Sequence, residues 1–100
     1  MSTLNLGVAG LGRLGRRHAL NLRDRIAGAR VIGVCSPLRE ELGWARRELP
    51  DAAGHAALEG LLAEPGLDAV LLATPTALHA EQIIACLDAG KHVSAKNRWR

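Results

Sequence analysis

The sequence predicts an α/β protein built on a doubly wound parallel sheet with helices on both faces. Short uncharged apolar runs alternate along the chain with segments whose apolar residues recur every three or four positions. This alternation is typical of strands and helices in a parallel sheet. A glycine-rich turn, GLGRLG, joins the first apolar run to the first helical segment. A length of 100 residues fits a single domain.

Two strand–helix units make up the first half of the chain. Residues 4–9 (LNLGVA) and 31–35 (VIGVC) are short apolar runs of the kind that form buried strands. The first helix should end at Gly28 and carry an apolar face of Leu14, His18, Leu22 and Ile26. The second helix should begin with Ser36 as its N-cap and Pro37 at its first position. It should end before Pro50, with an apolar face of Leu38, Leu42, Ala45 and Leu49.

The second half adds three strands and two helices. A weak strand is expected within residues 51–55, a short helix at 58–63, and the strongest buried strand at 68–73 (DAVLLA). The turn Thr74-Pro75-Thr76, with Thr76 as helix N-cap, leads into a helix whose apolar face should comprise Ala80, Ile83, Ile84 and Leu87. Residues 91–93 begin a fifth strand, after which the sheet is expected to end.

The glycine-rich turn carries the main functional signal. Gly10 permits a tight turn, Gly12 leaves room for a diphosphate to approach the backbone, and Gly15 lets the helix pack closely on the strand. The positive end of the following helix favours an anion. These features predict a dinucleotide-binding (Rossmann) fold, the alternative being a glycine-rich turn without a ligand. The candidate cofactor-binding residues of this turn are Gly10, Leu11, Gly12, Arg13, Leu14 and Gly15.

The end of the second strand should face the ribose of the cofactor. Many NAD-binding folds place a carboxylate there, but this chain has Ser36. A serine can hydrogen-bond a ribose hydroxyl without repelling a 2′-phosphate, and Arg39 is close enough in sequence to bind one. We therefore expect NAD or NADP as cofactor. The alternative is that Ser36 serves only as the helix cap.

The loop after the fourth strand should lie opposite the glycine turn, because ligands bind where the strand order of such a sheet reverses. Its rigid Pro75 would bring the backbone towards the nicotinamide half of the cofactor. His79 follows at the same end, as either a cofactor-side contact or a solvated surface histidine. The candidate residues here are Ala73, Thr74, Pro75, Thr76 and His79.

Charge and composition exclude several classes of partner. Residues 1–90 carry a net charge of −1, and the last ten residues carry +4. A basic excess confined to the chain end is weak support for a nucleic-acid surface. The apolar runs are too short for a transmembrane span, and the N-terminus resembles no secretion signal, so a cytoplasmic protein without a membrane partner is expected. Cys35 and Cys86 lack metal-site spacing and are expected to be reduced thiols.

Four motifs together resemble a known family: GVAGLGRLGRRHA, VCSP, LDAVLLATPTALHAEQ and AGKHV. They are similar to the N-terminal NAD(P)-binding domain of the Gfo/Idh/MocA oxidoreductases, over residues 3–93. The segment CSPLREELGWAR looks most like the myo-inositol 2-dehydrogenase branch. The resemblance implies hydride transfer between a sugar or polyol hydroxyl and a nicotinamide cofactor. It also implies a second domain that holds the substrate, supplies the acid–base histidine and forms the oligomer interface; that domain is absent from this sequence.

The family pattern breaks after Val93. Relatives continue with Glu-Lys-Pro, whose lysine contacts substrate and nicotinamide, whereas this chain reads SAKNRWR. Codons for those seven residues, preceded by one restored base, can be reread as Phe-Cys-Glu-Lys-Pro-Leu-Ala. We therefore expect residues 1–93 to be the dinucleotide-binding domain and 94–100 to be an aberrant basic tail from a frameshift in a truncated product. The alternative is a natural basic tail, and the coding DNA decides between them.

Two functions of different classes follow. The first is the cofactor-binding part of an inositol-like dehydrogenase, inactive alone because it has neither substrate domain nor Glu-Lys-Pro. The second is a regulatory module that binds a nucleotide without turnover. Both use the same glycine turn. Only the first needs a substrate held within about 3–3.5 Å of the nicotinamide and a base for the hydroxyl proton.

Overall fold

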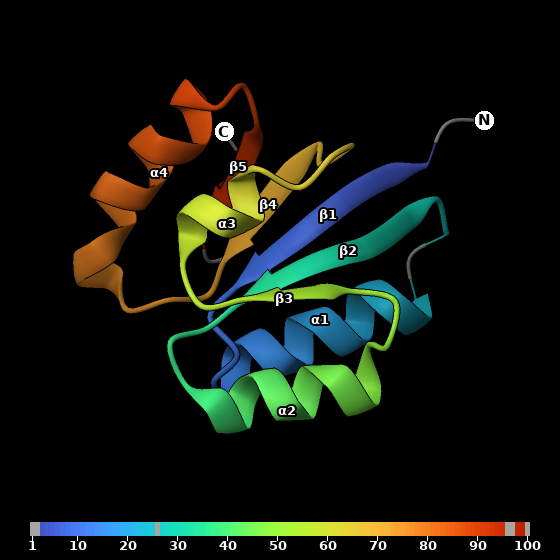
Figure 1. The fold of residues 1–100 in the computed structure, drawn as a ribbon. Helices are drawn as coiled ribbons and strands as arrows, with labels where there is room; N and C mark the ends of the chain where they lie inside the picture. Colours follow the sequence, from blue (N-terminus) through green and yellow to red (C-terminus); the bar gives the residue numbers. More distant parts are fainter. Residues whose placement is uncertain (1–2, 26, 96–97, 100) are drawn as a thin grey trace.

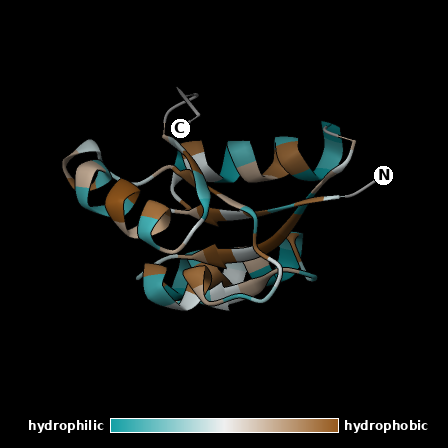
Figure 2. Cartoon of the chain, turned by 90° about the horizontal axis from the view of Figure 1, so that it is seen from above, coloured by the Kyte–Doolittle hydropathy of each residue, from teal (hydrophilic) through white to brown (hydrophobic). Residues whose placement is uncertain are grey.

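A computed structural model describes residues 3–25, 27–95 and 98–99, and it places a six-stranded sheet between two layers of helices (Figures 1 and 2). The strands are β1 (Leu4–Ala9), β2 (Ala29–Cys35), β3 (Ala53–His55), β4 (Ala69–Leu72), β5 (His92–Ala95) and β6 (Arg98–Trp99). The helices are α1 (Arg13–Arg25), α2 (Arg39–Glu48), α3 (Leu58–Leu62) and α4 (His79–Asp88), with a 3-10 turn at Thr76–Leu78 before α4.

The sheet has the order β3-β2-β1-β4-β5-β6, and its first five strands are parallel. The chain adds β2 and β3 on one side of β1, then crosses over to add β4 and β5 on the other. Helices α1 and α2 cover one face and α3 and α4 the other (Figure 1). The predicted fold class is confirmed. The direction of strand addition reverses between β1 and β4, so a switch point lies at their carboxyl ends.

Each face of the sheet buries its own aliphatic cluster. The cluster on the side of α1 and α2 includes Val8, Leu11, Ala19 and Val34. The cluster on the side of α3 and α4 includes Leu61, Val70, Cys86 and Val93. Leu61 is fully buried and lies directly over two glycines. A Cβ would stand only 2.9 Å from the Cδ1 atom of Leu61 at Gly7, and only 2.7 Å from it at Gly33. Burial of such a leucine contributes about 1.5–3 kcal/mol.

The inward faces of α1 and α2 match the predicted ones in part, because Leu22, Leu42, Ala45 and Leu49 pack in the buried cluster on this side of the sheet. In α1, the buried residues are Gly15 and Ala19, and Leu14 is 44% exposed; Ile26 lies outside the described residues. Small residues face the sheet because they allow the helix axis to approach it closely. Helix α2 begins at Arg39 instead of Pro37, so the predicted start at Ser36 was wrong and Leu38 is exposed.

The predicted apolar face of α4 was right at Ile83, which packs against the buried cluster, and wrong at its other positions. Ile84 and Leu87 are 60% and 50% exposed, while His79 and Cys86 are buried. Two apolar stripes lie side by side on this helix, and a periodicity argument selects the more aliphatic one. Helix α4 also starts at His79, so the prediction that Thr76 caps it was wrong; Thr76 opens the 3-10 turn.

The chain end departs from the prediction at the edge of the sheet. β5 continues through Ser94 and Ala95, which pair antiparallel with β6. A sixth strand therefore follows the expected fifth. The predicted basic tail falls partly on Lys96, Asn97 and Arg100, which lie outside the described residues. None of the helices in residues 3–25, 27–95 and 98–99 has both the length and the apolarity to cross a membrane.

Candidate functional site

A cleft of about 780 Å³ opens at the carboxyl ends of β1 to β4, at the switch point of the sheet. Four chain segments form its walls, one after each of these strands. They contribute residues 10–12, residues 35–38 with 41, residues 56–58, and residues 73–76 with 78 and 82. Parallel strands bring these segments together although they are far apart in the sequence.

The glycine turn lies closely packed at the base of this cleft. Gly10 has a φ of +91°, and its N–H donates to the Cys35 carbonyl at 2.9 Å. A Cβ at Gly10 would stand 2.9 Å from the Ala73 carbonyl group, and a Cβ at Gly15 would stand 1.8 Å from the Gly10 oxygen. Gly12 is exposed, and a Cβ there would meet nothing within 4 Å. Two glycines therefore serve the packing of the turn, while Gly12 leaves free space on the cleft side.

Helix α1 points its N-terminus at the cleft from this turn. The first N–H groups of a helix have no carbonyl partner within it, so they favour an anion. Arg13 and Leu14, both predicted to bind the cofactor, are exposed and do not line the cleft. They stand in the first turn of α1, beside the predicted diphosphate position.

Arg16 supports the turn in a way that motif spacing did not indicate. Its Nε–H donates to the Leu11 carbonyl at 2.9 Å, and its guanidinium carbon lies 5.2 Å from the ring centroid of Trp44 on α2. A cation over an indole ring is attracted by the negative ring face. Arg16 thereby connects the glycine turn, α1 and α2.

The end of the cleft where the ribose is predicted to bind contains a carboxylate that sequence reasoning missed. Ser36 is 1% exposed, and its Oγ accepts the Leu38 N–H at 3.0 Å. The same hydroxyl donates to Oε1 of Glu41 at 2.6 Å. Glu41 is half-buried and lines the cleft, whereas Arg39 is exposed and does not. The five-residue spacing from Ser36 to Glu41 gives no recognised signal, because a capping box needs a spacing of three.

The loop after β4 forms the opposite wall. This wall includes Thr74, Pro75 and Thr76, which were proposed from the sequence as cofactor-binding residues and which line the cleft. His79 is buried instead of lining the cleft, and its Nε2 lies 2.8 Å from the Thr74 carbonyl oxygen. The Thr74 hydroxyl also donates to the Gln82 side chain. His79 and Gln82 thus both hold Thr74, and Gln82 itself lines the cleft. The burial of His79 contradicts the role of a solvated surface histidine, and its role as a cofactor-side contact stays a prediction.

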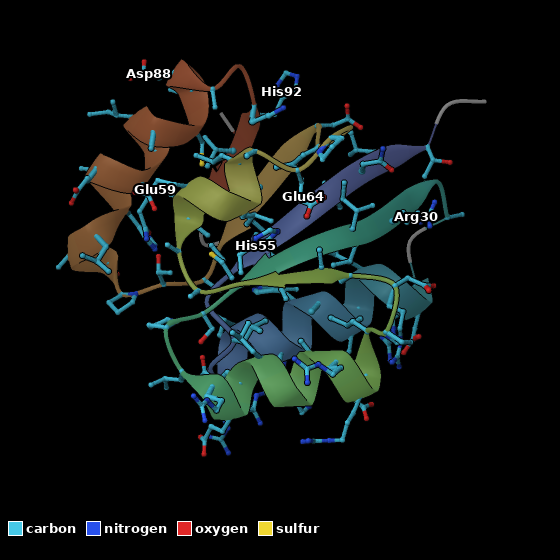
Figure 3. All side chains as sticks on the ribbon, in the orientation of Figure 1. Arg30, His55, Glu59, Glu64, Asp88 and His92 are labelled. Carbon is cyan, nitrogen blue, oxygen red and sulfur yellow. The ribbon has the colours of Figure 1, made fainter. Side chains whose placement is uncertain are left out.

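The third wall is fixed by a contact between β3 and the chain after α3. His55 Nε2 lies 2.8 Å from Oε1 of Glu64, and both side chains are labelled in Figure 3. The His55 carbonyl accepts the Ser36 N–H at 3.0 Å. This places residues 56–58 beside the ribose end of the cleft.

Both thiols are buried, and burial favours their neutral form. Burial raises the pKa of Cys35, below the glycine turn, from 9.0 to about 11, and burial likewise raises the pKa of Cys86 to about 11. A neutral thiol is a poor nucleophile and a poor metal ligand. In the part of the chain that the structure describes, no group of three or more His, Cys, Asp or Glu could hold a metal ion.

Comparison with known proteins agrees with this architecture. The model for the Gfo/Idh/MocA oxidoreductase family, an NAD-binding Rossmann fold, matches residues 4–95. The chain belongs to this family. The predicted resemblance is confirmed, and the expectation of a nicotinamide dinucleotide agrees with the NAD-binding fold of the family. The sequence left NAD and NADP both open.

Individual family members are similar over almost the whole chain. The inositol 2-dehydrogenase of Mycolicibacterium gilvum is 38% identical over 93 residues, which are 93% of this chain and 27% of the relative. The scyllo-inositol 2-dehydrogenase (NAD(+)) of Bacillus subtilis is 38% identical over 86 residues, 86% of this chain and 25% of the relative. The chain spans about a quarter of the length of these relatives.

A solved structure shows the same fold with a ligand. The scyllo-inositol dehydrogenase of Lactobacillus casei, solved with bound NAD(H) and scyllo-inositol, superposes with a TM-score of 0.89 at 35% identity. The match covers 94% of this chain and 28% of the other. The family fold therefore extends over the described part of this chain.

Proposed function

We propose that this chain binds NAD(H) in the cleft as the cofactor-binding part of a dehydrogenase that acts on a hydroxyl of an inositol-like polyol. The observation that carries the proposal is the cleft itself. It combines a Cβ-free backbone at Gly12, a helix N-terminus and the carboxylate of Glu41 in the first turn of α2. These are the features that receive a diphosphate and a ribose diol. Inositol is the substrate in the names of the relatives above.

The proposed cofactor position follows three of the four segments that line the cleft. The diphosphate lies over residues 10–12 at the N-terminus of α1, and the adenosine ribose lies near Ser36 and Glu41. The nicotinamide half then extends towards residues 73–76. Bound NAD⁺ supplies the hydride acceptor, and this chain's residues position it and exclude water from the turn.

Oxidation of a hydroxyl also needs a base close to the nicotinamide. Among the described residues that line the cleft, the ionisable side chains are Cys35 and Glu41. Cys35 lies below the glycine turn with a raised pKa, and Glu41 is at the ribose end. We therefore expect the 100-residue chain to bind NAD(H) without oxidising a polyol, and the base to come from the rest of a complete dehydrogenase.

The test compares NADH binding by the wild-type chain and by a Gly12→Ala variant. Fluorescence titration and thermal denaturation measure the binding. NADH should stabilise the wild type by about 2.7 kcal/mol at one hundred times its Kd. Gly12→Ala should keep the free-protein stability, because its Cβ meets no atom, and should lose binding. Unchanged NADH binding by Gly12→Ala would contradict the proposal.

A non-catalytic nucleotide-binding module uses the same cleft and is the alternative. Among the described residues, no ionisable side chain from the segment after β4 lines the cleft, and this observation favours the module. Joining this chain to the remaining residues of the Mycolicibacterium gilvum relative, and adding myo-inositol and NAD⁺, separates the two. Growth of the reduced-nicotinamide absorbance supports the dehydrogenase, and its absence with intact NADH binding supports the module.

A further inference from the structure

We propose that Glu41 makes this cleft select NAD(H) against NADP(H), in place of the acidic residue that the end of β2 lacks. The inference rests on the proposed function, because it names the cofactor that the same cleft accepts. It reverses the sequence expectation that Ser36 and Arg39 would tolerate a 2′-phosphate. Three observations carry it: the direction of the Ser36 hydrogen bonds, the place of Glu41 in the cleft wall, and the position of the neighbouring charges.

The Ser36 hydroxyl has one proton, and the geometry assigns it. Its Oγ accepts the Leu38 N–H at 3.0 Å, and the oxygen of Glu41 lies 2.6 Å away. A carboxylate oxygen has no proton to give, so the serine must donate to Glu41. A separation of 2.6 Å is typical of a hydroxyl donating to an ionised carboxylate. Ser36 therefore has no proton left for a ribose or a phosphate.

Glu41 is the polar group that this wall presents to a ligand. Ser36 is almost fully buried, whereas Glu41 is half-buried and lines the cleft. One oxygen of Glu41 is fixed by Ser36, which leaves the other to accept hydrogen bonds. A ribose diol can donate to that oxygen, but an ionised 2′-phosphate would bring negative charge beside it. The same carboxylate thus attracts NAD(H) and repels NADP(H).

The neighbouring charges do not cancel this effect. Arg39 and Glu40 precede Glu41 in the first turn of α2, and both are exposed and lie outside the cleft lining. Solvent screens exposed charges more strongly than half-buried ones. The positive end of the α2 dipole favours a carboxylate in this turn. The exposed Arg39 therefore does not offset the carboxylate of Glu41 at the cleft wall.

The test measures the Kd of NADH and of NADPH for the wild type, Glu41→Gln and Glu40→Gln. The wild type should bind NADH about tenfold or more tightly than NADPH. Glu41→Gln keeps an oxygen that accepts the Ser36 proton and removes the charge, so NADPH binding should strengthen and the ratio should fall about tenfold. Glu40→Gln changes the net charge equally and should leave the ratio unchanged.

The outcomes separate this inference from the proposed function. A wild type that binds neither nucleotide refutes the proposed function and this inference with it. NADH binding with equal NADPH affinity, or an equal shift of the ratio in Glu40→Gln and Glu41→Gln, overturns the inference alone. Circular dichroism checks that Glu41→Gln is folded. If it is not, Glu41→Asp tests the same point. This variant keeps the charge and should keep the preference for NADH, and a loss of that preference would count against the role of Glu41.

Discussion

Substitution of Gly15 by alanine should destabilise the protein strongly, although alanine is normally favoured in a helix. The added Cβ would stand 1.8 Å from the Gly10 carbonyl oxygen and 2.8 Å from its carbonyl carbon. An ordinary contact between carbon and oxygen is about 3.3 Å or longer. Helix α1 and the glycine turn must therefore separate by about 1.5 Å.

The surrounding structure resists that separation. Gly10 is held by its N–H bond to Cys35, and a Cβ on its other side would already touch the Ala73 backbone at 2.9 Å. Overpacking of a rigid core costs about 1–3 kcal/mol, and a clash between two backbone segments belongs at or above the upper end. We expect Gly15→Ala to lose about 3 kcal/mol, which corresponds to about 12–24 °C in Tm for a domain of this size.

Gly43 offers a matched control within α2. A Cβ there would meet only Nη1 of Arg47, at 3.7 Å, so Gly43→Ala should gain about 0.5–1 kcal/mol from helix propensity. Urea denaturation followed by circular dichroism gives the free energy of unfolding of both variants. A Gly15→Ala variant as stable as the wild type or Gly43→Ala would show that the turn does not pack against α1 as described.

Three further predictions test other parts of the structure. Arg16→Met should weaken NADH binding about fivefold by removing a hydrogen bond to the glycine turn worth about 1 kcal/mol, while the exposed neighbour Arg17→Met should not; fluorescence titration checks both. Leu61→Ala should lower the free energy of unfolding by about 2–5 kcal/mol in urea, because it empties the site over Gly7 and Gly33. Because burial raises the pKa of Cys35 from 9.0 to about 11, its neutral form is favoured in the folded state. The contribution of the neutral Cys35 thiol to the free energy of unfolding should be complete below pH 9 and lost as the pH rises towards 11. Urea denaturation at several pH values should therefore show stability falling over this range in the wild type and falling less in Cys35→Ala.

The sequence by itself determined the fold class and the position of the glycine turn. Each of the first five strands was placed within about two residues, because apolar runs bounded by glycine and proline are local signals. The order of strands and helices then implied a parallel sheet with a switch point. The weak strand at β3 was recovered because alternation required a strand there.

Only the tertiary structure decided which side chains meet in the cleft. The orientation of α2 depends on its start at Arg39, and that start brings Glu41 to the Ser36 hydroxyl. Likewise, the burial of His79 places its ring against the Thr74 carbonyl instead of the cleft. The rotation of a helix about its axis is fixed by close packing against strands that are distant in sequence. Neither periodicity nor motif spacing therefore predicts this rotation.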